Sequence, residues 1–159
     1  MGSQSNVRFS YIAGFLDGDG SLMLQIKQRP KTKSGYRFMA TICFYQDTRH
    51  ESGLVWIQKV LKIGYLSRRK DGITELRING FTQVNEILIK IYPYIQFKKI
   101  QAEALIEATN ILKDKNVNQL CEAELERIVK LIILLRKHNY KSSYRKSLVS
   151  IRKTLGLTP

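Results

Sequence analysis

The segment from Tyr11 to Ser21 constrains this chain more than any other, because it joins small and apolar residues to two carboxylates separated by glycines. Ala13 and Gly14 would leave one helix surface nearly flat, so that a second backbone can approach it closely. Glycine inside a helix costs about 1 kcal/mol relative to alanine, and close packing is the simplest source of compensation. The sequence predicts a helix from Ser10 to Leu16 that ends at the following glycines.

The carboxylates of this segment indicate a site for a hard divalent cation. Gly18 and Gly20 permit backbone geometries that direct carbonyl oxygens and the Asp19 carboxylate towards one point. Oxygen ligands of this kind suit Mg²⁺, Mn²⁺ or Ca²⁺. An EF-hand loop is excluded, because it would need glycine at Leu22 and a bidentate acid at Gln28. A plain Asp-Gly turn without a metal remains the alternative, and it would be favoured for this tetrapeptide in isolation.

The charge balance indicates a polyanionic partner. The 159 residues carry 27 Lys and Arg against 13 Asp and Glu, a formal net charge of +14. That excess predicts nucleic acid ahead of an anionic membrane, because the sequence has no basic helix with a bulky apolar face. No apolar run is long enough to span a bilayer. A basic protein without such a partner is the alternative.

The chain is predicted to form one domain over residues 1–159, with residues 1–6 as a flexible leader and residues 139–159 as a basic tail. A hydrophobic content of 43% is enough for one core. Cys43 and Cys121 lack the spacing of a zinc site or a disulfide framework, which favours a reducing intracellular setting. Frequent Ile, Lys, Asn and Tyr residues are typical of AT-rich coding, as in a chloroplast or mitochondrion.

Changes of hydrophobic period along the chain predict an α+β domain. Leu22, Leu24 and Ile26 alternate with more polar residues, the pattern of a half-buried strand. Asp71-Gly72 indicates a hairpin between two further strands. The expected order is αββαββ, with a four-stranded antiparallel sheet and additional C-terminal helices. After the first helix, the expected strands are 22–27, 37–45, 64–69 and 73–79, and the expected helices are 54–63, 81–92, 98–113, 122–137 and 143–155.

The outward faces of the predicted strands are unusually basic for a solvated sheet. Arg, Gln and Lys side chains match base edges and phosphates, and a two-stranded β-ribbon fits the major groove of DNA. A solvent-facing sheet that happens to be basic is the alternative. The candidate nucleic-acid contacts on the sheet and its first turn are Met23, Gln25, Lys27, Arg29, Lys31, Lys33, Arg37, Met39, Thr41, Cys43, Tyr45, Ser67, Arg69, Glu75 and Arg77.

The run Tyr-Ile-Ala-Gly-Phe-Leu-Asp-Gly-Asp-Gly-Ser resembles the signature of the LAGLIDADG homing endonucleases. The order of elements, Gln46 at the close of the second strand and Lys98 after Pro93 also lie where this family places them. The signature occurs once, as in the single-motif, group I intron-encoded members that work as homodimers. The resemblance implies a saddle-shaped sheet and a long, pseudo-palindromic double-stranded DNA target, cut across the minor groove to leave short 3′ overhangs.

The resemblance also assigns catalytic roles to single residues. Asp19, helped by the Gly18 carbonyl, would bind Mg²⁺, with Mn²⁺ as a substitute and Ca²⁺ bound without supporting cleavage. Metals so placed activate a water and stabilise the leaving oxygen. Lys98 would stabilise developing phosphate charge or tune the attacking water, and Gln46 would order water in the same pocket.

Two copies of the first helix would pack across a twofold axis, with Asp17 structural rather than catalytic. Arg49 and His50 both fit a further basic position that the family often carries. An RNA maturase or a non-cleaving nucleic-acid binder of the same fold is the alternative function. The implied dimer contacts are Ile12, Ala13, Gly14, Phe15, Asp17 and Gly18, and the implied DNA-backbone contacts of the tail are Asn139, Tyr140, Lys141, Ser143 and Arg145.

Overall fold

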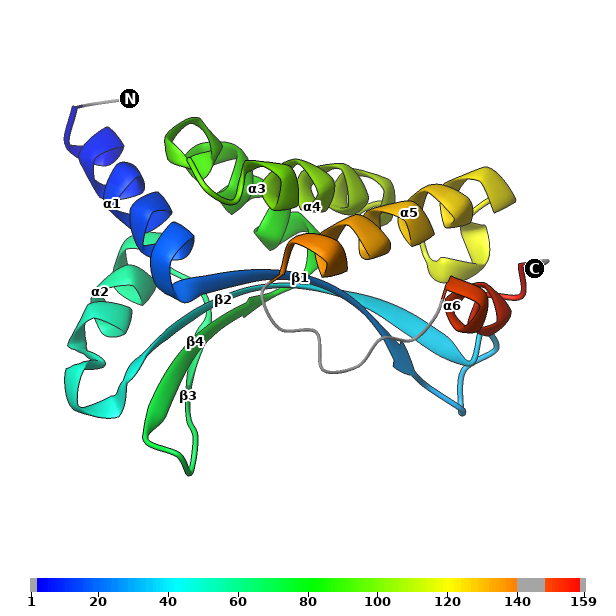
Figure 1. The fold of residues 1–159 in the computed structure, drawn as a ribbon, viewed down its shortest axis with the longest axis horizontal. Helices are drawn as coiled ribbons and strands as arrows, with labels where there is room; N and C mark the ends of the chain where they lie inside the picture. Colours follow the sequence, from blue (N-terminus) through cyan, green and yellow to red (C-terminus); the bar gives the residue numbers. More distant parts are fainter. Residues whose placement is uncertain (1–2, 140–147, 158–159) are drawn as a thin grey trace.

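The computed structural model describes residues 3–139 and 148–157. They form the predicted α+β fold, in which four antiparallel strands are ordered β1-β2-β4-β3 (Figure 1). The predicted αββαββ order with further C-terminal helices is confirmed. In chain order, the α-helices, strands and 3₁₀ helices (η) are α1 (Ser3–Asp19), β1 (Gly20–Gln28), β2 (Tyr36–Asp47), η1 (Thr48–His50), α2 (Ser52–Leu61), β3 (Tyr65–Arg68), β4 (Ile73–Asn79), α3 (Phe81–Ile91), η2 (Tyr92–Tyr94), α4 (Lys99–Leu112), η3 (Val117–Gln119), α5 (Glu122–His138) and α6 (Leu148–Thr154).

The sheet is a strongly curved saddle, and helices α3, α4 and α5 lie over its convex side (Figure 1). The alternation in β1 and β2 sets the inner face, since Leu22 pairs with Ile42 and Leu24 with Ala40, and all four side chains are buried. Apolar faces of the three helices complete one hydrophobic core on this side. The concave side therefore carries the alternate residues of each strand, whose side chains the sequence predicts to be basic.

Helix α1 differs from the prediction at both ends. It begins at Ser3, so residues 3–6 of the predicted leader are helical. It continues through Gly18 to Asp19, because the buried side chains of Ile12 and Leu16 hold the helix against the core and outweigh the small cost of one glycine. The turn into β1 comes at Gly20, where a Cβ atom would lie 2.8 Å from the Leu16 carbonyl oxygen. Glycine is required at this helix–strand junction for steric reasons alone.

The remaining boundaries move by a few residues. Strand β3 ends at Arg68, because the Arg69 backbone already forms the turn and donates to the Ile73 carbonyl at 2.8 Å. The predicted tail helix is described as α6 only, and the candidate contacts Tyr140, Lys141, Ser143 and Arg145 lie outside the described residues. None of the described helices is both long and apolar enough to cross a lipid bilayer.

Candidate functional site

Asp17 joins the end of α1 to the start of α4. Its carboxylate accepts hydrogen bonds from the backbone nitrogens of Gln96 at 2.6 Å, Phe97 at 3.2 Å and Lys98 at 3.0 Å. Those donors precede the first turn of α4, where backbone N–H groups have no partner inside the helix. Asp17 is therefore structural, as expected. It is also buried in its own chain, and its predicted place between two subunits stays a prediction.

Replacing Asp17 with alanine is expected to lower the free energy of unfolding by about 3 kcal/mol or more, because three backbone donors lose a charged acceptor. Asp114→Ala is the matched control, since this carboxylate is exposed, and its cost should stay below about 0.5 kcal/mol. Urea unfolding of both variants measures the difference. Equal losses would contradict the capping role.

Lys98 lies directly beside the acidic end of α1. Its ammonium donates to the Asp17 carbonyl oxygen at 2.5 Å, and the residue is only 6% exposed. Burial lowers the pKa of Lys98, and the Asp17 and Asp19 carboxylates partly oppose this shift by attraction. The electrostatic contribution of Asp19 means that the structure brings this carboxylate and the Lys98 ammonium into one small region.

Asp19 is the last residue of α1 and is exposed, whereas Asp17 two positions earlier faces the core. Two residues along a helix turn through about 200°, so the two carboxylates point in nearly opposite directions. Among the described residues, no group of three or more His, Cys, Asp or Glu side chains could hold a metal ion. Asp19 is thus a lone exposed carboxylate, and a metal site predicted at this residue would need oxygens from elsewhere.

Gln46 lies at the same end of the sheet. Strand β1 starts with Gly20 opposite Phe44, and Gln46 follows two residues later on the same face of β2 as Phe44. Its Oε1 accepts a hydrogen bond from the backbone nitrogen of Asp47 at 2.9 Å. Gln46 and the end of α1 therefore lie at the same end of the sheet, although 27 positions separate Gln46 from Asp19 in the sequence.

Two basic residues follow Gln46 in η1. The Arg49 guanidinium contacts the Asp47 carboxylate through Nε at 3.0 Å and Nη2 at 2.8 Å, which lowers the pKa of Asp47 and raises that of Arg49. His50 is exposed. Since the Arg49 fork already has a carboxylate partner, the geometry favours His50 for the basic position, and this assignment stays a prediction.

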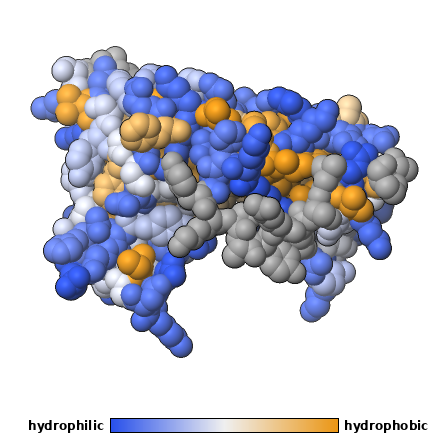
Figure 2. Space-filling view, viewed as in Figure 1, coloured by the Kyte–Doolittle hydropathy of each residue, from blue (hydrophilic) through white to orange (hydrophobic). Residues whose placement is uncertain are grey.

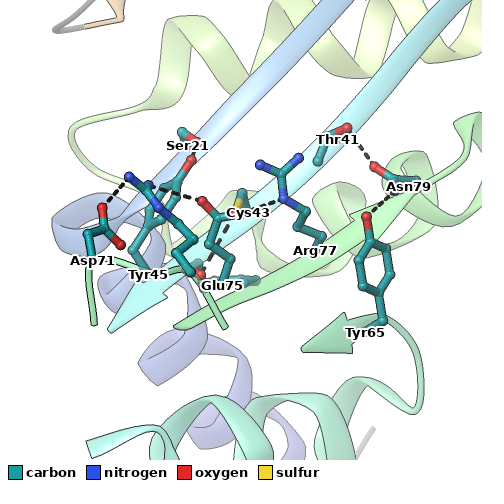
Figure 3. Close-up of polar contacts among 11 residues, drawn as sticks. Ser21, Thr41, Cys43, Tyr45, Tyr65, Asp71, Glu75, Arg77 and Asn79 are labelled. Atoms are coloured by element: carbon teal, nitrogen blue, oxygen red, sulfur yellow. Dashed lines mark hydrogen bonds and ion pairs between the residues drawn. The ribbon is translucent and has the colours of Figure 1, made fainter. Parts of the chain in front are cut away.

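Figure 3 shows a polar network on the concave face of the sheet, built from β1, β2, β4 and the edge strand β3. At its centre Glu75 accepts from Arg69 Nη1 at 3.2 Å and from Arg77 Nε at 2.6 Å. The Asp71 carboxylate accepts from the second terminal nitrogen of Arg69, Nη2, at 2.5 Å. These carboxylates raise the pKa of both arginines and fix the guanidinium groups in place.

Three predicted DNA contacts are buried members of this network. Thr41 and Cys43 are fully buried and Glu75 is 5% exposed. All three lie on β2 and β4, the inner strands of the sheet, which pair with a neighbouring strand on both sides. Thr41 donates to Asn79 at 2.7 Å, and burial raises the pKa of the Cys43 thiol to about 11. Their burial favours a supporting role beneath the accessible side chains, and their predicted contact with DNA stays a prediction.

The other sheet candidates are accessible. Met23, Gln25, Lys27, Arg37 and Met39 are exposed or half-buried and occupy paired positions of β1 and β2. Figure 2 shows that the projecting hairpin ends of the sheet are hydrophilic. In the tail, Asn139 donates to the Leu22 carbonyl at 3.1 Å, so its side chain anchors the chain to edge strand β1, and its predicted contact with DNA stays a prediction.

The outer face of α1 differs from the predicted dimer surface. Ile12 and Ala13 are fully buried in their own chain, and Phe15 packs against Phe44 with ring centroids 6.1 Å apart. Gly14 and Gly18 are exposed, and a Cβ atom on either would meet no atom within 4 Å. The resemblance implied dimer contacts along the whole segment from Ile12 to Gly18, and the interface itself stays a prediction.

Several exposed apolar side chains beside these glycines were not predicted. Val7 is 66% exposed, Tyr11 59% and Phe97 82%. The Tyr11 ring also stacks edge-on against Trp56 of α2, with centroids 5.3 Å apart. For Val7 and Tyr11 the signal in the sequence was the spacing of positions 7, 11, 14 and 18, which share one face of α1. We define Val7, Tyr11, Gly14 and Gly18 as the outer strip of α1.

This combination of a saddle-shaped sheet and an acidic helix end next to a buried lysine defines a known class of protein. Residues 12–107 match the LAGLIDADG endonuclease family, and the chain belongs to that family. It is 32% identical over 120 residues to the DNA endonuclease I-CvuI of Chlorella vulgaris. The matched residues make up 75% of this chain and 74% of the relative. It is 26% identical over 108 residues to I-CreI of Chlamydomonas reinhardtii, covering 67% and 66% of the two chains.

The fold matches solved structures over nearly its whole length. I-CvuI in complex with its target in the presence of 2 mM Ca has a TM-score of 0.83 at 23% identity, covering 99% of this chain and 100% of that one. I-CvuI with the I-CreI target in the presence of 2 mM Mg, in which the DNA is not cleaved, has a TM-score of 0.82 and covers 98% and 96%. The predicted fold is thereby confirmed.

Proposed function

We propose that this chain is a site-specific homing endonuclease that binds double-stranded DNA as a homodimer and hydrolyses one phosphodiester in each strand. The exposed Asp19 carboxylate carries this proposal, because it stands at the end of α1 beside Lys98 and at the edge of a basic, concave sheet. A non-cleaving binder has no use for an exposed carboxylate where phosphates would approach, since like charges repel.

The donor set at this site fits a hard divalent cation. Asp19 and the Gly18 carbonyl supply oxygens, and a second copy of α1 together with phosphate oxygens would complete the coordination. Mg²⁺ is the proposed ion, with Mn²⁺ able to substitute and Ca²⁺ able to bind without supporting cleavage. When bound, such an ion supplies Lewis acidity and lowers the pKa of a nearby water.

The remaining groups act on the phosphate and the water. The buried Lys98 ammonium stabilises negative charge that develops on the scissile phosphate, and its bond to the Asp17 carbonyl fixes its position. The Gln46 amide orients water near the reacting phosphorus atom. Each role needs the side chain to be held in place, which the bond from Asp47 to Gln46 and the burial of Lys98 provide.

DNA binds along the concave face, with each subunit covering one half-site. Arg69 presents fixed donors from the β3–β4 turn and Arg77 from β4, while Lys27, Arg29 and Arg37 lie towards the β1–β2 hairpin. The net charge of +14 makes affinity strongly dependent on salt, because phosphate contacts release counterions. The accessible proposed contacts are Met23, Gln25, Lys27, Arg29, Lys31, Lys33, Arg37, Met39, Tyr45, Ser67, Arg69 and Arg77.

Selection from a library of randomised palindromic DNA duplexes in Mg²⁺ tests this function. The expected products are duplexes of one pseudo-palindromic sequence class, cut in both strands with short 3′ overhangs. Binding without cleavage of any library member would favour the non-cleaving alternative, and preferential binding of structured RNA would favour a maturase. An organellar gene remains part of the proposal, supported by the abundance of Ile, Lys, Asn and Tyr.

A further inference from the structure

Glu51 links the loop after Gln46 to the β3–β4 hairpin. It stands between η1 and α2, and its side chain is 19% exposed. The carboxylate accepts from Arg68 through Nε at 2.9 Å and through Nη2, and from Thr74 Oγ1 at 2.8 Å. These bonds lower the pKa of Glu51 to about 2, so the group is ionised wherever DNA cleavage is measured.

Thr74 connects Glu51 to β4, an inner strand of the sheet. It is fully buried on β4, and it is the cross-strand partner of Gln46 on β2. Its hydroxyl also hydrogen-bonds with Thr48 Oγ1 at 3.0 Å, and the Thr48 backbone nitrogen donates to the Gly72 carbonyl in the hairpin turn at 2.8 Å. Two sets of bonds therefore connect η1 to the β3–β4 hairpin. One is formed by the side chains of Glu51 and Thr74, and the other by the backbone of Thr48.

The same turn sets the orientation of the Gln46 amide. Gln46 Oε1 accepts from the backbone of Asp47, and the Asp47 carboxylate in turn accepts from the Arg49 backbone nitrogen at 2.9 Å. A shift of η1 would move the donor that holds Gln46. Arg68 is 69% exposed at the end of edge strand β3. The chain of bonds therefore runs from the hairpin proposed to face DNA to Gln46.

We propose that Glu51 is a positioning residue, which fixes the η1 turn and the Gln46 amide relative to the β3–β4 hairpin through Arg68 and Thr74. This inference rests on the proposed function, in which the hairpin contacts DNA and Gln46 orders water. Glu51 touches neither DNA nor the reacting groups. Loss of its charge should therefore slow the chemical step while leaving the affinity for DNA nearly unchanged.

The matched experiment compares Glu51→Gln with Glu107→Gln. Glu107 forms a similar two-pronged ion pair with Arg127, at 2.5 Å and 2.7 Å, between α4 and α5 on the convex side. Each variant loses one negative charge and one such pair. Single-turnover cleavage at saturating DNA in Mg²⁺ should fall about 10- to 100-fold for Glu51→Gln and less than about 2-fold for the control. Affinity measured in Ca²⁺ should change less than about 3-fold in both.

Amide hydrogen exchange supplies a readout that does not depend on cleavage. Glu51→Gln should speed exchange at Thr48 and Arg49, whose backbone donors are bonded in the wild-type turn, and Glu107→Gln should leave them unchanged. Arg68→Gln should reproduce the effect of Glu51→Gln, and the double variant should be no worse than either single variant.

Each outcome decides between the possibilities. Unchanged exchange in Glu51→Gln, or equal changes in both glutamine variants, would overturn the positioning role. A loss of DNA affinity as large as the loss of rate would also overturn it, since Glu51 would then only compete with DNA for Arg68. Faster exchange together with a wild-type protein that cuts no DNA would leave the link intact and refute the proposed function instead.

Discussion

Replacing Asp19 with asparagine is expected to abolish double-strand cleavage while DNA binding is retained. The side chain is exposed at the end of α1, so the change removes a charged ligand without disturbing the core. The loss should exceed the roughly 10²- to 10³-fold that accompanies removal of one electrostatic stabiliser. Cleavage in Mg²⁺ and binding in Ca²⁺ measure the two effects separately.

The control for Asp19→Asn is Asp17→Asn, which makes the same chemical change two positions earlier. The Asp17 carboxylate caps the chain before α4, so this variant should lose stability, whereas Asp19→Asn should unfold like the wild type. Equal loss of binding and cleavage in Asp19→Asn, or cleavage that persists, would refute the assignment of Asp19 as a metal ligand.

Replacing Gly14 with leucine is expected to raise the dissociation constant of the homodimer about 10- to 100-fold. Cleavage should fall in parallel. Within one chain a Cβ atom at this position meets nothing within 4 Å, so the fold of the single chain should tolerate the larger side chain. Between two chains it would hold the α1 helices apart, and overpacking of a tight contact costs about 1–3 kcal/mol.

Sedimentation at several protein concentrations measures this dissociation constant. Lys130→Leu is the matched control, because it adds the same side chain at an exposed position of α5, a helix that packs mainly against α4, β1 and α6. A Gly14→Leu protein that dimerises like the wild type would show that the outer strip of α1 is not the subunit interface.

The sheet was predictable because a strand alternates strictly and its burial follows from that alternation. Leu22 and Leu24 face the core as expected, and Asp71-Gly72 closes the β3–β4 hairpin. Helix α1 was harder to orient from sequence. It has apolar residues around much of its circumference, so the pattern could not show that Ile12 faces the core while Tyr11 faces outward.

The site was predictable only as far as the signature reached. The carboxylates and glycines of the segment indicated Asp19 as a metal ligand, the resemblance indicated Lys98, and both roles stay predictions. The proximity of the two side chains is a property of the fold. The capping bonds of Asp17 join groups 79 to 81 positions apart, and no local pattern encodes such a contact. The burial of Glu75 between two arginines likewise depends on which side chains share the concave face, since its own strand position predicts exposure.

The central claim is that one chain contains half of an active site and that a second copy supplies the rest. The most direct test is the mass of the protein–DNA complex, measured by sedimentation alongside cleavage of the same duplex. Two chains per duplex are predicted, with double-strand cleavage that rises with the square of protein concentration below the dimer dissociation constant. A single bound chain that cuts both strands, or a protein that stays monomeric with and without DNA at micromolar concentration, would contradict it.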